Sequence, residues 1–118
     1  MVANPSVAGK TRFALAVAVV LACQLPLAAQ PKVEFNRDVR PILAENCFAC
    51  HGPDSAARKA GLRLDQREDA IKIGAIAPGK VADSALVERI TATDPKQIMP
   101  PVKSHKKLTA AQKETLKQ

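Results

Sequence analysis

The sequence has little from which to build a large core. It holds no tryptophan, no tyrosine and only three phenylalanines in 118 residues. Phe13 lies in the first apolar segment, so Phe35 and Phe48 are left for a folded domain after it. A chain of this length forms one small domain at most, and such domains are marginally stable even with a good core. This shortage favours a large apolar cofactor, whose burial would contribute roughly 25 cal/mol per Å².

The sequence also lacks the features of a nucleic-acid-binding protein. Lysine and arginine exceed aspartate and glutamate by seven, and by five without Lys10 and Arg12. These basic residues are scattered, and no aromatic residues interleave with them, which argues against nucleic acid as a partner. A mild positive charge instead predicts attraction toward an acidic redox partner protein.

No apolar run approaches the roughly 20 residues that a membrane-spanning helix needs. Met1–Arg12 is polar with a basic end, Phe13–Ala22 is apolar, and Leu27–Ala29 offers small residues for cleavage before Gln30. This order predicts a secretory signal peptide at residues 1–29 and a mature domain at residues 30–118. A membrane anchor is the alternative. The predicted location of the mature domain is the periplasm or cell envelope.

Cys23 leaves a second possibility open within that leader. Val20-Leu21-Ala22-Cys23 resembles a lipoprotein processing box, in which the cysteine becomes the lipidated N-terminus. We favour the simpler interpretation that Cys23 is an apolar residue of the signal peptide. Contact with a membrane is predicted only if Cys23 is lipidated.

The strongest pattern is Cys47-Phe48-Ala49-Cys50-His51, which is typical of a c-type haem attachment site. Each thiol adds across one haem vinyl group, and the following histidine supplies the proximal nitrogen to iron. The spacing is required because two covalent tethers and one axial ligand must reach one flat ring from a single turn of backbone. Haem c attachment also takes place outside the cytoplasm, in agreement with the predicted export.

Two other chemistries fit part of this pattern. A Cys-x-x-Cys pair can form a redox disulfide, but that interpretation is best supported within a βαβ unit, and the sequence indicates none. A zinc site would need Cys47, Cys50 and His51 together with His105. A histidine adjacent to a ligating cysteine is poorly placed to bind the same tetrahedral ion.

Met99 is the candidate for the sixth position of a haem iron. It is the only methionine after the predicted signal peptide and lies in Ile98-Met99-Pro100-Pro101, a loop that its prolines hold extended. A thioether ligand favours ferrous iron and raises the reduction potential. Core packing is the alternative role for Met99. His105 is the rival ligand, but its neighbours Lys103, Lys106 and Lys107 suggest a solvated segment.

The remaining pattern predicts an all-α domain of short helices and irregular segments. A first helix carries Phe35, Val39, Ile42, Leu43 and Cys47, with Asn36 as its N-cap and Pro41 as a kink or restart. Further elements are a helical turn at Ser55–Ala60, an extended piece at Leu62–Asp65, a helix at Arg67–Lys72 with Asp65 as a possible cap, a loop at Gly74–Lys80, a helix at Ser84–Thr91 and a last helix after the capping box Thr109–Gln112.

These stretches resemble the planctomycete cytochrome c-like domain. The resemblance rests on Val33–Leu43, Asn46–Asp54, Gly61–Asp65, Pro78–Lys80 and Met99–Pro101. It implies a mostly helical cytochrome c fold that wraps around one covalently attached haem. It also implies thioether bonds at Cys47 and Cys50, and His51 and Met99 as proximal and distal ligands of the iron. Because such domains usually open longer proteins, we expect this chain to be a piece that ends within its last helix.

The sequence thus predicts an exported electron-transfer module rather than an enzyme. No pair of carboxylates is placed for acid–base catalysis, and Asp65, Glu68 and Asp69 fit the solvated start of a helix. A larger parent protein could still be an enzyme. One alternative is a haem enzyme or gas sensor with a labile sixth ligand, and another is a zinc or disulfide-bridged interaction module without haem.

Overall fold

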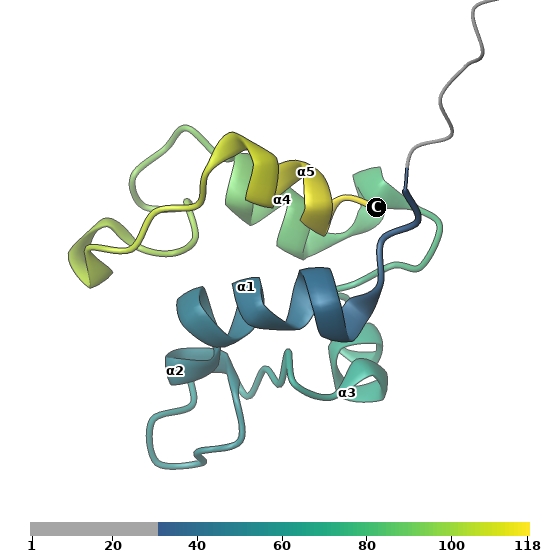
Figure 1. Ribbon diagram of the computed structural model, residues 1–118. Coiled ribbons are helices and arrows are strands. Elements are labelled where there is room, and N and C mark those ends of the chain that lie inside the picture. Colours follow the sequence, from purple (N-terminus) through teal and green to yellow (C-terminus); the bar gives the residue numbers. More distant parts are fainter. Residues whose placement is uncertain (1–30) are drawn as a thin grey trace, which may run out of the picture. The chain divides into compact units, whose positions relative to one another are not determined.

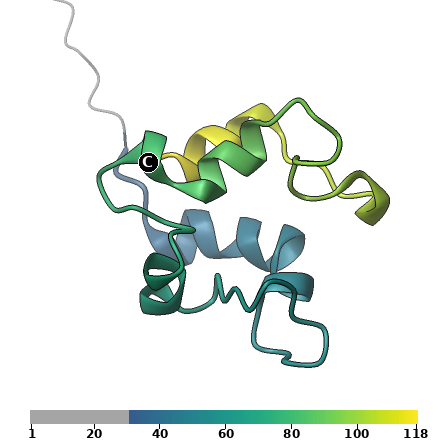
Figure 2. The ribbon, with the colours of Figure 1, turned by 180° about the vertical axis from the view of Figure 1, so that it is seen from behind.

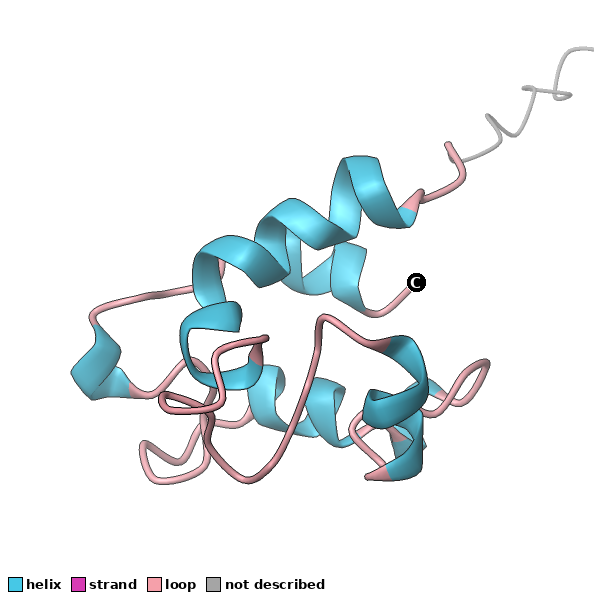
Figure 3. Ribbon diagram, turned by 90° about the horizontal axis from the view of Figure 1, so that it is seen from below, coloured by secondary structure: helices cyan, strands magenta, loops and turns pink. Residues whose placement is uncertain are grey.

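The computed structural model describes residues 31–118. The predicted signal peptide and Cys23 lie outside the described residues. Within the described range all regular structure is helical and no strand occurs (Figure 3), which confirms the all-α prediction. In this part of the chain no helix is long and apolar enough to cross a membrane. The elements are η2 (Phe35–Val39), α1 (Arg40–Asn46), α2 (Phe48–His51), α3 (Arg67–Lys72), η3 (Val81–Asp83), α4 (Ala85–Thr91), η4 (Val102–Ser104) and α5 (Ala110–Leu116).

The first predicted helix forms as two joined segments. η2 is a five-residue π-helix, and α1 follows directly with Pro41 in its first turn, where a missing backbone N–H is tolerated. The predicted cap at Asn36 is wrong, because the N-cap position is Glu34 and its side chain makes no capping bond. The carboxylate of Asp38 instead accepts the Glu34 backbone N–H at 2.8 Å.

α1 lies at the centre of the domain, between α4 and α5 on one side and α3 on the other (Figure 1). Figure 2 shows the same arrangement from behind. Adjacent residues of a helix point about 100° apart, so Ile42 and Leu43 enter two different apolar clusters. Ile42 packs with Ile90 of α4 and with Leu108, whereas Leu43 packs with residues from the α3 side.

The core is as small as the composition predicts. Its buried hydrophobic residues are Ile42, Leu43, Leu64, Ala70, Ala75, Ile90 and Leu108. Among residues 31–118, Leu43 and Ile90 are the largest fully buried side chains. Leu116 of α5 packs partly against both clusters and joins them. Phe35, predicted on the apolar stripe of the first helix, remains 51% exposed.

The segment between α2 and α3 differs from the sequence prediction. The helical turn predicted at Ser55–Ala60 is absent, and residues 55–57 form a non-helical turn instead. The predicted extended piece at Leu62–Asp65 is also absent, since these residues form no strand. Asp65 does not cap α3, because it pairs with Arg63 at 2.5 Å and Gln66 takes the N-cap position. Leu64 is buried, and its backbone N–H donates to the His51 carbonyl at 2.8 Å. Tertiary contact with α2 therefore replaces local extended structure.

The later helices follow their sequence signals closely. α3 has the predicted bounds, and the capping box at the start of α5 is present, with the Thr109 side chain accepting from Gln112 N–H at 3.1 Å. α4 begins one residue later than the predicted helix, at Ala85, and Ser84 occupies its N-cap position. Its hydroxyl nevertheless accepts the Ala77 N–H at 2.9 Å, so it closes the preceding loop instead of capping the helix.

Candidate functional site

The two cysteines and the histidine are presented by one turn of backbone. α1 ends at Asn46, and Cys47 has the non-helical torsions φ −123° and ψ −38° before α2 begins at Phe48. The Cys47 carbonyl accepts two backbone N–H groups, from Cys50 at 3.1 Å and from His51 at 2.8 Å. The sequence predicted that the first helix, kinked or restarted at Pro41, continues to Cys47 without a break there. Because of this break, Cys50 and His51 lie on a short second helix, α2, and Cys47 occupies its N-cap position.

Both thiols are free, but their surroundings differ. Cys47 is half-buried against the cluster that contains Leu43, whereas Cys50 is exposed. Burial raises the pKa of the Cys47 thiol to about 11, an effect opposed by the nearby charge of Lys106 and reinforced by Cys50. Cys47 therefore remains a neutral thiol, anchored in the core, while Cys50 is open to a reaction partner.

The ring of His51 is oriented by a backbone carbonyl. Its Nδ1 lies 3.2 Å from the Lys59 carbonyl oxygen. A carbonyl can only accept a hydrogen bond, so this contact places the ring proton on Nδ1 and leaves Nε2 with a free lone pair. Metal-ligating histidines are commonly oriented in this way by their second ring nitrogen. The half-buried His51 thus fits an axial ligand, and the adjacent thiols fit the two thioether tethers of a haem.

The loop after His51 is held close to α2 at Gly52. A Cβ atom on this buried glycine would lie 2.4 Å from the Phe48 carbonyl oxygen and 3.0 Å from Phe48 Cα. The side chain of Arg58 donates to the Gly52 carbonyl at 3.0 Å and to the Pro53 carbonyl at 2.8 Å. These contacts fold the loop back toward α2, so that the carbonyl of Lys59 reaches the His51 ring.

Met99 lies in the loop between α4 and η4. Its side chain is half-buried, its backbone N–H donates to the Arg89 carbonyl at 3.0 Å, and the following Pro100 is buried. In Figures 1 and 2 this loop lies at the same end of α1 as α2. The Lys106 ammonium group donates to the Glu45 carbonyl and ties the loop to that end. Ligation of iron by Met99 stays a prediction.

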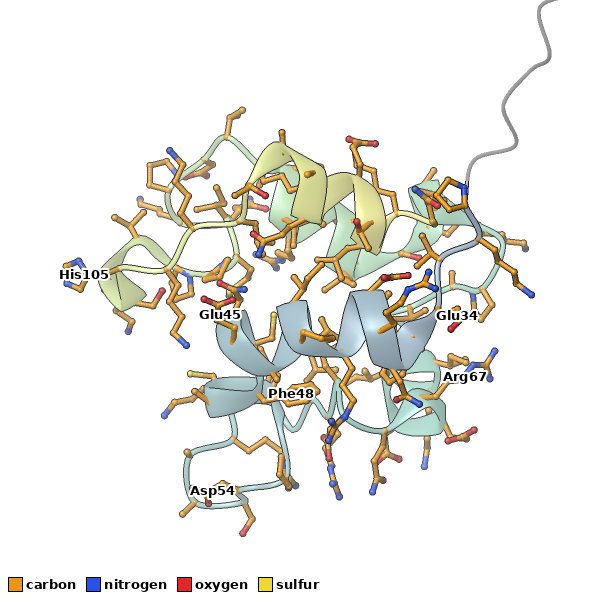
Figure 4. The ribbon with its side chains drawn as sticks, in the orientation of Figure 1. Glu34, Glu45, Phe48, Asp54, Arg67 and His105 are labelled. Carbon is orange, nitrogen blue, oxygen red and sulfur yellow. The ribbon has the colours of Figure 1, made fainter. Side chains whose placement is uncertain are left out.

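His105, the rival sixth ligand, lies directly after η4, at the outer edge of the domain (Figure 4). It is exposed and has a left-handed backbone conformation with φ +56°. Within residues 31–118 no group of three or more His, Cys, Asp and Glu side chains is placed to hold a metal ion. The zinc alternative therefore has no ligand set in this range, because His105 does not join Cys47, Cys50 and His51.

Comparison with protein families places this site in a known context. Residues 47–103 match the family model described as planctomycete cytochrome C. This match supports a planctomycete cytochrome c-like domain in this part of the chain. The matched segment begins at Cys47 and includes Met99, and a cytochrome c domain implies covalently bound haem c with its iron. Comparisons with curated proteins and with solved structures found no match to this chain.

Sequence reasoning missed two contributors to this site, the Lys59 carbonyl and Lys106. The Lys59 carbonyl acts through its backbone, so its side chain gives no signal for it. Lys106 lies far along the chain from Glu45, and only folding brings the two together. The glycine directly after His51 was a readable signal for a turn, but its tight approach to Phe48 depends on the helix break at Cys47.

Proposed function

We propose that this cytochrome c-like domain is an exported electron carrier that holds one covalent haem. The observation that carries the proposal is the turn Cys47–His51, where two free thiols adjoin a histidine whose Nδ1 faces a backbone carbonyl. In this proposal Cys47 and Cys50 form the thioether bonds, His51 is the proximal ligand and Met99 is the distal ligand. Haem, when bound, supplies a one-electron couple between ferric and ferrous iron.

The protein's own residues would then orient the iron ligands and set the reduction potential of the haem. The carbonyl of Lys59 keeps His51 in one tautomer and increases its basicity as a ligand. The half-buried Cys47 fixes one edge of the attachment turn to the core, and the thioether of Met99 would favour the reduced state. Two firm axial ligands leave no open position for substrate, so we propose no enzymatic activity for this domain.

Covalent attachment is tested by maturing the chain in cells that carry haem-attachment machinery. We expect the haem to stay with the polypeptide during denaturing electrophoresis, to stain for peroxidase activity and to raise the protein mass by one haem. A Cys50→Ala variant, which retains the half-buried Cys47, is the matched control and should keep one thioether at most. Complete loss of haem from the wild-type chain under denaturing conditions would contradict the proposal.

Distal ligation is tested by Met99→Ala in the haem-loaded protein. We expect loss of the weak far-red band that reports a sulfur–iron bond in the ferric state, and a lower reduction potential, because the thioether stabilises ferrous iron. His105→Ala is the control and should change neither property, since His105 is exposed at the outer edge of the domain. An unchanged Met99→Ala spectrum together with an altered His105→Ala spectrum would assign the ligand to His105.

A further inference from the structure

The net positive charge of the described domain comes entirely from residues 95–118. Residues 31–94 contain ten basic and ten acidic side chains, so they carry no net charge. Residues 95–118 contain six lysines and a single acidic residue, Glu114. Glu114 is already paired with Lys117 at 2.7 Å. The segment that contains Met99 therefore accounts for the whole positive balance of the described domain.

Part of this charge follows an exposed apolar side chain in the sequence. Val102 is 65% exposed, more than any other large hydrophobic residue of the described range. The next residues include three exposed lysines, Lys103, Lys106 and Lys107, together with the exposed His105. We call residues 102–107 the Val102–Lys107 surface. In the described part of the chain none of its lysines forms an ion pair. An apolar centre with a charged rim is the usual anatomy of a protein interface.

The Val102–Lys107 surface adjoins the attachment site. The Lys106 ammonium group donates to the Glu45 carbonyl, two residues before Cys47, and its charge acts on the Cys47 thiol. A cation near the C-terminal end of α1 is also favoured by the helix dipole. This contact keeps the lysine-rich loop beside the turn that carries Cys47, Cys50 and His51. A partner bound there would lie next to the edge at which the thioethers form.

The basic residues of this segment are all lysines, with no arginine among residues 95–118. Lysine is a strongly hydrated point charge, whereas arginine forms planar bidentate pairs with carboxylates. Lysines therefore accelerate association through long-range attraction without holding the partner for long. An electron carrier needs fast association and a short-lived complex, because it must release its partner after each electron transfer.

We propose that the Val102–Lys107 surface is the docking site for an acidic redox protein. The proposal rests on the proposed electron-transfer function and names the chemistry of its partner. In the docked complex one electron passes from the reduced partner to ferric haem, which gives oxidised partner and ferrous haem. No bond forms or breaks and no proton is required.

The test uses an acidic plant-type [2Fe–2S] ferredoxin, a low-potential one-electron donor, as the probe. Its reduction of the haem-loaded protein is followed by stopped flow at about 10 mM and about 1 M salt, where the Debye length is roughly 30 Å and 3 Å. We compare Lys103→Glu/Lys107→Glu with Lys72→Glu/Lys80→Glu, a control with the same change of total charge. Lys106 is left unchanged because it also holds the Glu45 carbonyl.

We expect the Lys103→Glu/Lys107→Glu variant to react at least about ten-fold more slowly than wild type in low salt, and the difference to vanish in high salt. The Lys72→Glu/Lys80→Glu control should stay within about three-fold of wild type. Val102→Ser should slow the ferredoxin reaction at both salt concentrations, since apolar contact is not screened. Equal slowing of the two glutamate variants would overturn the proposal, because only total charge would then matter.

Two further measurements separate the docking proposal from the function on which it rests. Photoreduced lumiflavin is a small neutral donor, so it should reduce the haem of every variant at the wild-type rate. Failure of lumiflavin to reduce wild type would overturn the proposed electron-transfer function itself. Normal lumiflavin rates with no salt dependence toward ferredoxin would overturn the docking site alone.

Binding is also measured without electron transfer. Oxidised ferredoxin, added to the oxidised protein, should shift the backbone amide NMR signals of residues 102–107 more than those around Lys72 and Lys80. The same titration is made with phosphatidylglycerol vesicles. Shifts of residues 102–107 with the vesicles but none with ferredoxin would overturn the proposal in favour of a membrane surface.

Discussion

The variant Cys47→Ala/Cys50→Ala, prepared without haem, is expected to lose most of its helical circular dichroism and its cooperative melt. The side chains alone form two small clusters whose largest fully buried members are Leu43 and Ile90. Below about 70–80 residues a core of side chains rarely supplies more than about 3–5 kcal/mol, and this domain is only slightly larger while its core is poorer.

Haem attachment would supply two stabilising contributions that the clusters lack. A buried porphyrin adds apolar surface against which several short helices can pack. Ligation of one iron by His51 and Met99 would also close a loop of 47 intervening residues. Crosslinks around loops of such a size contribute roughly 3–5 kcal/mol in the chain-entropy model. Folding should therefore follow haem attachment, as it follows metal binding in small metal-dependent domains.

The control for this prediction is the wild-type chain expressed without attachment machinery and kept reduced. It retains the partly packed Cys47 thiol, so it separates the loss of haem from the loss of two sulfur atoms. We expect both haem-free proteins to melt without a cooperative transition and the haem-loaded wild type to melt cooperatively. A full helical signal and a sharp melt in both haem-free proteins would show that the side-chain core is sufficient.

Gly52→Ala is expected to have the second largest effect, on stability and on haem content together. The added Cβ would lie 2.4 Å from the Phe48 carbonyl oxygen, a backbone atom that cannot move aside as a flexible side chain could. Relief of this overlap requires a shift of the chain directly after His51. Overpacking of this kind costs about 1–3 kcal/mol, which lowers the melting temperature of a domain of this size by roughly 5–20 °C.

The displaced backbone should also disturb the attachment turn. A shift at Gly52 moves the loop that brings the Lys59 carbonyl to His51, so we expect less haem per polypeptide, measured by absorbance of the reduced pyridine complex. Gly61→Ala is the matched control. Its Cβ would meet nothing within 4 Å, although its φ of +63° makes alanine mildly strained. Equal haem content in the two variants would contradict the role assigned to Gly52.

Local chemistry allowed much of the helical architecture to be predicted from sequence. Thr109 and Gln112 cap α5 through contacts three residues apart, and Pro41 permits a helix only in its first turn. The attachment turn itself was readable because Cys47, Cys50 and His51 must lie on one turn to serve one ring. These features depend on neighbours within four residues, which the sequence displays directly.

The wrong predictions of strand and helix caps arose where a polar group binds a partner other than the one that local sequence suggests. Leu62–Asp65 alternates as a strand would, but the Leu64 N–H finds its acceptor at His51, and Asp65 pairs with Arg63 instead of capping α3. Asn36 has the chemistry of a cap, yet the helical segment begins before it, with Glu34 as the N-cap. In each case a polar group had several possible partners, and local propensity could not rank them.

The amino-acid sequence alone was enough to predict the spacing of Cys47, Cys50 and His51 on one turn, the helical class and the shortage of core-forming side chains. Tertiary structure decided that the Lys59 carbonyl orients His51, that Ile42 and Leu43 serve two clusters, and that Lys106 holds a lysine-rich loop beside Cys47. The physical reason is the range of the interactions. Spacing along one turn is encoded in adjacent residues, whereas the partner of a backbone carbonyl or an ammonium group is selected only when distant segments pack together.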